Sequence, residues 1–265
     1  MKKLFLIILF SNISLLSAQE DWSRSNVCEY KIDDDYLIEQ LIKAMSIEDK
    51  VGQVIQGDLD FVTPADVKKY KLGSVLNGGN TSPNGDKYSS VEDWKTLSKD
   101  FYEASPIYKG IRVPVLWGTD AVHGHNNVIG ATLFPHNIGL GATRNEELIK
   151  SIGEAIALEV LSTGVAWTFA PTIAVPQDDR WGRTYEGFSE DPILVSKLGK
   201  AFVLGLQGEG DALLDKNHVI ATAKHFMGDG GTLRGVDQGN TIISEMGLRQ
   251  LHGYPYFDAL DACAQ

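Results

Sequence analysis

Short apolar runs alternate with amphipathic stretches along most of the chain. Four apolar runs that lead into glycine or polar residues predict β-strands. They lie at 72–76, 113–117, within 165–175 and at 219–223. Two segments between them, 145–161 and 192–206, carry apolar residues at helical spacing. This alternation predicts parallel βα units joined by right-handed crossovers.

Helix boundaries are also visible in the sequence. Ser46 is expected to cap a first helix, and Pro64 suits the first turn of a second helix that ends at Gly73. Glu190 and Asp191 are interpreted as the start of the helix over 192–206 rather than as catalytic groups. A last helical pattern covers 244–261, with no strand after it.

The number of strands bears on the fold class. A closed barrel of eight βα units takes about 250 residues, or roughly 31 per unit. Residues 46–265 are 220 residues long (265 − 46 + 1) but contain only the four recognisable strands. We therefore expect an α/β fold, a partial (β/α)8 TIM-type barrel that is incomplete at the C-terminal side. A piece of a longer protein is favoured over a complete small α/β domain.

The start of the chain resembles an export signal. Two lysines precede an apolar stretch over 4–16, and small residues follow at Ser17 and Ala18. We assign 1–19 to a signal peptide and 20–45 to an N-terminal extension. The apolar stretch of 13 residues is shorter than the roughly 20 that span a bilayer, so no stable membrane insertion is expected after cleavage, a membrane anchor being the alternative. The protein is expected to be periplasmic or secreted.

Composition narrows the choice of partners. The formal net charge is −11, and the sequence shows no stripe of basic residues that could neutralise a polyanion. No nucleic-acid partner is therefore expected. No phosphate-binding loop or dinucleotide fingerprint is present, and no cofactor is expected. The two cysteines, Cys28 and Cys263, lie in no redox or metal-ligand spacing, and two unpaired thiols are favoured over a disulfide.

Polar residues that could bind a ligand or take part in chemistry follow the predicted strands. The strand at 219–223 leads into Lys224, His225 and Asp229 in a glycine-rich loop. In α/β folds, ligands bind at the carboxyl ends of parallel strands, because loops there can place charged groups in a cleft on a rigid support. We therefore expect the functional charges of the chain at such ends.

A second cluster follows the strand at 113–117. Asp120 is its main candidate, because a carboxylate can accept hydrogen bonds from two adjacent sugar hydroxyls. His123 and His125 could also contact a ligand, but histidines beside glycine in such turns more often support the loop.

Two further clusters complete the set. In 179–192, Arg183 is the candidate that faces a ligand and Arg180 the structural one. In 235–240, Gln238 is a candidate for the outer wall of the pocket, although an ordinary turn explains the glycines around it equally well.

These clusters, in this order, resemble glycoside hydrolase family 3, in particular its β-glucosidase and exo-β-glucan glucohydrolase branch. The stretches that carry the resemblance are Asp120-Ala-Val-His-Gly-His-Asn-Asn, Phe134-Pro-His-Asn137, Arg180-Trp-Gly-Arg183 with Ser189-Glu-Asp-Pro192, and Lys224-His-Phe226. The resemblance implies retaining hydrolysis of terminal non-reducing β-D-glucosyl residues. The implied substrate is a β-glucoside or β-glucan oligosaccharide.

The resemblance also implies roles for individual residues. Asp120, Arg183, Lys224 and His225 would hold the hydroxyls of the terminal sugar, and Gln238 stands where some relatives carry a glutamate. The family nucleophile, an aspartate in a later Ser-Asp-Trp-like motif, and the acid, in a second domain, are both expected beyond Gln265.

No residue of this chain is therefore assigned as catalytic. Asp229 is interpreted as support for its loop. The family often has a non-prolyl cis peptide near the lysine-histidine pair, which we expect between Lys224 and Met227.

Two other functions remain as alternatives. One is a non-catalytic sugar-binding fragment. The other, less favoured, is a metal-dependent barrel hydrolase that uses His123, His125 and His225, with Lys224 or Asp229, around zinc.

Overall fold

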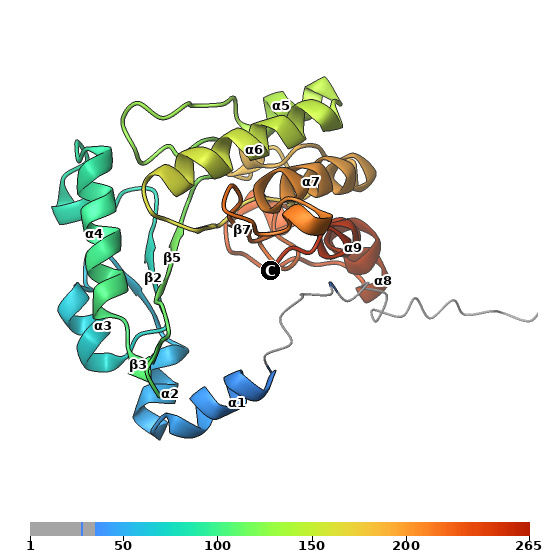
Figure 1. Ribbon diagram of the computed structural model, residues 1–265. Helices are drawn as coiled ribbons and strands as arrows, with labels where there is room; N and C mark the ends of the chain where they lie inside the picture. Colours follow the sequence, from blue (N-terminus) through green and yellow to red (C-terminus); the bar gives the residue numbers. More distant parts are fainter. Residues whose placement is uncertain (1–27, 29–34) are drawn as a thin grey trace, which may run out of the picture.

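The computed structural model describes Cys28 and residues 35–265 (Figure 1). The predicted signal peptide at 1–19 lies outside the described residues, as does most of the segment expected as an N-terminal extension. The end of that extension forms helix α1, Asp35–Ala44. Among the described helices, none has the length and apolar character to cross a bilayer.

A parallel sheet of five strands forms the centre of the described part. Its strands follow one another in space in their sequence order, β1-β2-β5-β6-β7, which is the order of a barrel wall. Their bounds are Gln56–Asp58, Ser74–Asn77, Leu116–Thr119, Trp167–Thr168 and Ile220–Ala221. The predicted α/β fold with parallel strands is confirmed. A separate antiparallel pair, β3 (Ile107–Tyr108) and β4 (Ile111–Arg112), precedes β5.

Helices form an arc around these strands (Figure 1). They are α2 (Ile47–Gln53), α3 (Pro64–Tyr70), α4 (Val91–Ala104), α5 (Asn137–Thr143), α6 (Glu146–Ser162), α7 (Pro192–Gln207), α8 (Glu245–Gly247) and α9 (Tyr254–Asp261). Short 3-10 turns lie at Pro83–Gly85, Thr184–Glu186, Gly210–Ala212 and Leu233–Gly235. The long helical pattern at the end of the chain is divided by a π-helical segment, Leu248–Gly253, between α8 and α9.

Side-chain caps explain where several helices begin. Ser46 and Asp49 form the reciprocal hydrogen bonds of a capping box at α2, and Thr63 and Asp66 do the same at α3. The side chain of Asp191 accepts a hydrogen bond from the backbone of Ile193 at the start of α7. The predicted helix starts at Ser46, Pro64 and Asp191 are confirmed.

The hydrophobic core lies between the sheet and the arc of helices. Trp94, Phe101 and Phe202 are among its largest fully buried side chains. Helices α6 and α7 pack closely because Gly205 faces α6: a Cβ atom at this position would lie 2.2 Å from the carbonyl oxygen of Lys150. This close packing makes a rigid layer behind the strands from which the polar loops leave.

A disulfide joins Cys28 to Cys263, with the two Cα atoms 5.7 Å apart. The expectation of two unpaired thiols was therefore wrong. Sequence spacing carried no signal because the two cysteines are 235 positions apart, and only the fold brings Cys28 to the end of α9. The bond ties the N-terminal side of the described chain to its last helix.

We expect the Cys263→Ser variant to lower the free energy of unfolding by about 2–4 kcal/mol, because the disulfide restricts the unfolded chain over a very long loop. Urea titration of the oxidised wild type and the variant measures the difference. Cys28→Ser and reduced wild type serve as controls and should show the same loss, whereas an unchanged unfolding midpoint in all three would show that the bond does not stabilise the fold.

Candidate functional site

A cavity of about 380 Å³ opens where the loops after β2, β5, β6 and β7 meet. Its lining residues are Gly79, Asp120, Val122, His123, Asn126, His136, Arg183, Tyr185, Glu186, Lys224 and His225. Four of the five predicted site residues, Asp120, Arg183, Lys224 and His225, therefore lie in one pocket. They come from three separate loops, at the ends of strands where α/β folds bind ligands.

Lys224 and Asp120 form an ion pair across the pocket. Lys224 Nζ donates to Asp120 Oδ1 at 2.8 Å, with 13% of the lysine and 32% of the aspartate side chain exposed. Asp120 follows β5 directly. Two backbone hydrogen bonds fix Lys224 to the segment that follows β6. Its N–H donates to the carbonyl oxygen of Pro171, and its own carbonyl oxygen accepts from the N–H of Ile173. The pair joins positions 104 residues apart in the sequence.

Arg183 and Glu186 form a bidentate pair beside it. Arg183 Nε donates to Glu186 Oε1 at 2.7 Å, and Nη2 donates to Oε2 at 2.8 Å. Burial alone would raise the pKa of Glu186, but hydrogen bonding to Arg183 and its positive charge hold the pKa below its ordinary value. The same hydrogen bonds raise the pKa of Arg183. Both groups are therefore charged at neutral pH.

His225 connects Arg183 to the glycine-rich loop. Arg183 Nη2 lies 3.0 Å from His225 Nε2, and His225 Nδ1 lies 2.7 Å from Asp229 Oδ2. The peptide bonds Lys224–His225 and Phe226–Met227 are both cis, which confirms the expected non-prolyl cis bond in this stretch. Asp229 is not among the residues that line the pocket and contacts it through His225.

The histidines after β5 divide into two environments. His123 lines the pocket, with its Nδ1 3.2 Å from the carbonyl oxygen of Phe134 and its ring against His136. Burial and the neighbouring His136 lower the pKa of His123. His125 is fully buried, bonded to Thr163 and packed against Trp94, and burial lowers its pKa to about 4.

The zinc alternative requires His123, His125 and His225 at one site. His125 does not line the pocket that contains the other two. Within residues 35–265 and Cys28, no three His, Cys, Asp or Glu side chains are grouped in a way that could hold a metal ion.

Two other candidates lie outside the pocket. Arg180 is exposed and pairs with Asp178 at 2.5 Å, as the structural role predicted for it requires. Gln238 is exposed on its turn and is not one of the lining residues. Its neighbour Asp237 instead accepts a hydrogen bond from Trp181 Nε1 at 2.9 Å, so the 235–240 turn is anchored next to the arginine loop.

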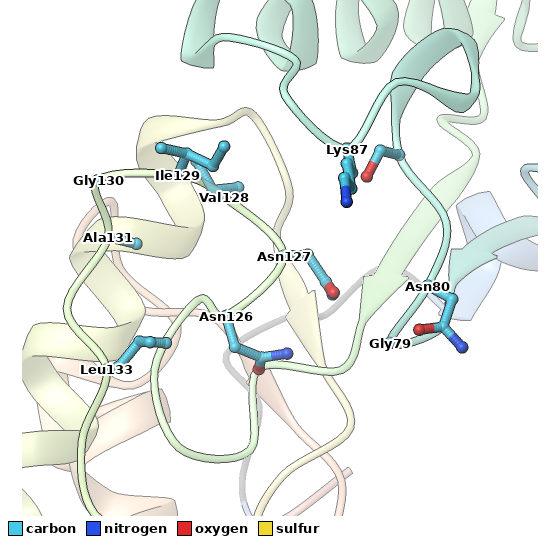
Figure 2. Close-up of a pocket in the computed structure, with 11 residues that line it drawn as sticks. Gly79, Asn80, Lys87, Asn126, Asn127, Val128, Ile129, Gly130, Ala131 and Leu133 are labelled. Carbon is cyan, nitrogen blue, oxygen red and sulfur yellow. The ribbon is translucent and has the colours of Figure 1, made fainter.

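A second cavity of about 450 Å³ adjoins the first, and Figure 2 shows its lining. It shares Gly79 and Asn126 with the pocket and is otherwise formed by residues after β2 and by the loop around 127–133. Asn126 forms the boundary between the two: with its amide in the favoured orientation, its nitrogen donates to the carbonyl oxygens of Asp120 and Gly124.

Sequence reasoning missed several lining residues. Glu186 carries the acidic charge that pairs with Arg183, and a signal was available, since an arginine and a glutamate three residues apart can meet in one helical turn. His136 and Tyr185 pack ring to ring at the pocket. His136 lies in the Phe134–Asn137 stretch that contributed to the family resemblance, but nothing in its spacing indicated a contact with the site.

Comparison with known proteins shows which family the chain belongs to. Residues 46–265 match the glycosyl hydrolase family 3 N terminal domain. The chain belongs to this family.

Relatives of known name include the lysosomal beta glucosidase of Dictyostelium discoideum, 34% identical over 82% of this chain and 28% of that protein. The periplasmic beta-glucosidase of Salmonella typhimurium is 28% identical over 86% of this chain and 28% of its own length. This chain therefore spans less than a third of either relative.

A solved exo-1,3/1,4-beta-glucanase from a Pseudoalteromonas species is 53% identical and superimposes with a TM-score of 0.83. The match covers 87% of this chain and 38% of that one. The Listeria innocua beta-glucosidase in complex with isofagomine is 27% identical, with a TM-score of 0.70, over 87% of this chain and 31% of that one. The fold is therefore a TIM-barrel-like α/β fold shared with family 3 glucosidases.

The Arg183–Glu186 pair predicts a pH-dependent stability. At pH 7, Glu186→Gln should lower the free energy of unfolding by about 1–3 kcal/mol, because a charge-assisted pair is lost. The folded-state pKa of Glu186 is depressed, so its contribution is complete above the unfolded value near 4.5 and is lost as pH falls through the lower folded value. Urea unfolding between pH 3 and pH 7 should show the difference between wild type and variant shrinking in acid.

Glu209→Gln is the matched control for this measurement. Glu209 accepts from Lys150 at 2.7 Å, but the pair is exposed, and its loss should cost less than about 1 kcal/mol. An equal cost for the two variants at pH 7, or a Glu186 effect that does not change with pH, would contradict the assignment of Glu186 as a buried, charged partner.

Proposed function

We propose that the pocket binds one terminal, non-reducing β-D-glucosyl residue of a β-glucoside or β-glucan. The observation that carries this proposal is the convergence of Asp120, Lys224 and Arg183 on a single cavity of about 380 Å³. A pyranose presents adjacent hydroxyl groups that each donate and accept a hydrogen bond. Carboxylate oxygens match the donors, and ammonium and guanidinium groups match the acceptors.

The charges in the pocket suit a neutral ligand. Asp120 with Lys224 and Glu186 with Arg183 make two oppositely charged pairs, so these four groups sum to zero. A phosphate would have to compete with two carboxylates, whereas a sugar adds no charge. The ring of Tyr185 and the side chain of Val122 supply apolar lining beside the polar groups.

In the proposed reaction, the glucosidic bond is hydrolysed with retention, through a carboxylate nucleophile and a separate carboxylic acid. This chain supplies the glucose-binding groups, and the nucleophile and acid belong to a longer protein beyond Gln265. Support comes from the relatives, since this chain matches only 38% of the solved exo-1,3/1,4-beta-glucanase and 28% of each of the two glucosidases. Support also comes from the pocket, where both lining carboxylates already serve as partners of basic groups.

A non-catalytic sugar-binding fragment is the second candidate. The same ion-paired carboxylates favour it, because a carboxylate that bonds to a lysine or arginine is a poorer nucleophile or acid than a free one. Both candidates bind glucose, and only turnover by a longer protein separates them.

We also place the protein outside the cytoplasm, in the periplasm or secreted. The Cys28–Cys263 disulfide supports this location, since disulfides persist in oxidising compartments. The Salmonella typhimurium relative is a periplasmic enzyme by name.

Binding of glucose to this chain tests the pocket. Asp120→Ala and Lys224→Ala should each weaken glucose binding by about 1.5–3 kcal/mol, because each removes a charged hydrogen-bond partner. Titration calorimetry or NMR titration with glucose measures the loss. Lys150→Ala is the matched control, since it breaks an exposed ion pair of similar length and should leave the affinity unchanged. Equal affinity in wild type and both pocket variants would refute the proposed ligand contacts.

Hydrolysis of an aryl β-glucoside tests whether this chain supplies the glucose-binding groups without the nucleophile and acid. The 265-residue chain should bind glucose but release no aryl alcohol above background, because its pocket lacks the paired acid and nucleophile. A longer protein that contains this chain should turn the substrate over. Hydrolysis by this chain alone, abolished by Asp120→Ala, would show that the catalytic pair is already present.

A further inference from the structure

Asp229 and His225 form a connected pair immediately behind the pocket. Asp229 Oδ2 lies 2.7 Å from His225 Nδ1, and the other ring nitrogen, Nε2, lies 3.0 Å from Nη2 of Arg183. Only 14% of the Asp229 side chain is exposed. The Asp229 carboxylate is thus linked to the Arg183 guanidinium group through the imidazole ring of His225, and Asp229 does not itself line the pocket.

The chemistry of the two partners fixes where the ring proton lies. A guanidinium group only donates hydrogen bonds, so Nε2 of His225 must accept one from Arg183. A carboxylate only accepts, so Nδ1 must carry the proton that it shares with Asp229. The two contacts are satisfied together only by a neutral ring with its proton on Nδ1.

The loop that carries Asp229 is held firmly in place. Thr241 Oγ1 donates to the carbonyl oxygen of Gly228 at 2.7 Å, and the backbone N–H of Gln177 donates to that of Gly230 at 2.8 Å. His252 lies directly behind the loop, so close that a Cβ atom on Gly231 would be 2.3 Å from its Nε2. Asp229 therefore has little freedom to leave His225.

Two buried polar side chains, His252 and Tyr256, lie near enough to Asp229 for its charge to raise their pKa values. His252 is 3% exposed, and both of its ring nitrogens and the hydroxyl of buried Tyr256 lack a hydrogen-bond partner in the described part of the chain. Burial lowers the pKa of His252, while the charge of Asp229 raises it. Neither of these side chains bonds to Asp229, whose one side-chain hydrogen bond in the described chain is to His225.

The geometry points to Asp229 as a positioning residue that holds His225 in the Nδ1–H tautomer, so that Nε2 remains an acceptor that orients Arg183 in the sugar pocket. The inference rests on the proposed glucose-binding function, since it assigns a role within that pocket. A plain loop-supporting role differs from it in one respect: it predicts no effect of Asp229 on the tautomer of His225.

The tautomer can be measured directly by ¹⁵N NMR of the histidine rings in the oxidised 265-residue chain. In the wild type at neutral pH, His225 should show a protonated Nδ1 and an unprotonated Nε2. Wild-type His225 with its proton on Nε2 would overturn the inference without any variant.

Two substitutions at Asp229 extend the test. In Asp229→Ala the acceptor for Nδ1–H is gone, so the proton should move to Nε2 in a large share of molecules. Glucose should then bind about tenfold more weakly, because Arg183 keeps its bonds to Glu186 but loses the acceptor at His225. In Asp229→Asn the amide oxygen can still accept from Nδ1–H, so the tautomer should be kept and the affinity should stay within about threefold of wild type.

The matched control is Asp215→Ala. Asp215 Oδ1 lies 2.7 Å from Nδ1 of His218, so this pair has the same geometry as Asp229 with His225 but lies outside the pocket. The variant should change the ring state of His218 alone and leave glucose binding unchanged. Loss of glucose affinity in this control would overturn the inference, because the effect would then not depend on the pocket histidine.

The outcomes are distinguishable from failure of the proposed function. An unchanged His225 tautomer in Asp229→Ala, or a changed tautomer with unchanged affinity, overturns the positioning role. If wild-type protein with the Nδ1–H tautomer binds no glucose, the proposed function fails and with it the role assigned here. If Asp229→Ala does not fold, as judged by circular dichroism, the wild-type tautomer and the Asp229→Asn affinity still decide the question.

Discussion

The site depends on the pairing of opposite charges in the loops that follow β5, β6 and β7. A lysine that is 13% exposed would pay a large desolvation cost if it stood alone. Asp120 offsets this cost for Lys224, and Glu186 offsets the cost of the partly buried guanidinium of Arg183. The Asp120–Lys224 pair joins the loops that follow β5 and β7, whereas the Arg183–Glu186 pair lies within the loop that follows β6. Removing one partner of either pair would leave a partly buried charge unpaired.

The sequence was informative about the fold wherever burial imposes a pattern. Strand β7 and helices α6 and α7 have apolar runs or helical spacing that matches their burial, and they lie close to the predicted ranges. Strand β1 was missed because Gln56-Gly57-Asp58 carries no apolar side chain, and its strand character comes only from pairing with β2. The π-helical segment within the last helical pattern was also invisible, since its residues keep a helical period on both sides.

For the site, the sequence indicated which residues have suitable chemistry but not how they are paired. Asp120, Arg183 and Lys224 could be named because each follows a predicted strand or stands in a recognisable motif. Glu186 was missed although it stands three residues after Arg183 in the same loop. His136 could not be selected, because its role depends on ring contacts that only the fold creates. The same limit applied to Cys28 and Cys263, whose proximity is a property of the folded chain. His125, for which the sequence left a ligand contact open but favoured support of the loop, is bonded to Thr163 within the core.

The pairs in the pocket also limit how the proposed sugar ligand can be bound. Within the described chain, Arg183 uses Nε and Nη2 for its protein partners, and Asp120 uses Oδ1. The atoms that remain for hydroxyl groups are Nη1 of the arginine, Oδ2 of the aspartate and the other N–H groups of Lys224 Nζ, at positions already fixed by the bonds within the pocket. A sugar therefore meets groups that need little reordering, which reduces the entropy lost on binding. Because no ion pair must be broken, the affinity should reflect the fit of the hydroxyl groups to these few atoms, and a stereoisomer that misplaces one hydroxyl leaves a polar atom of the pocket without a partner.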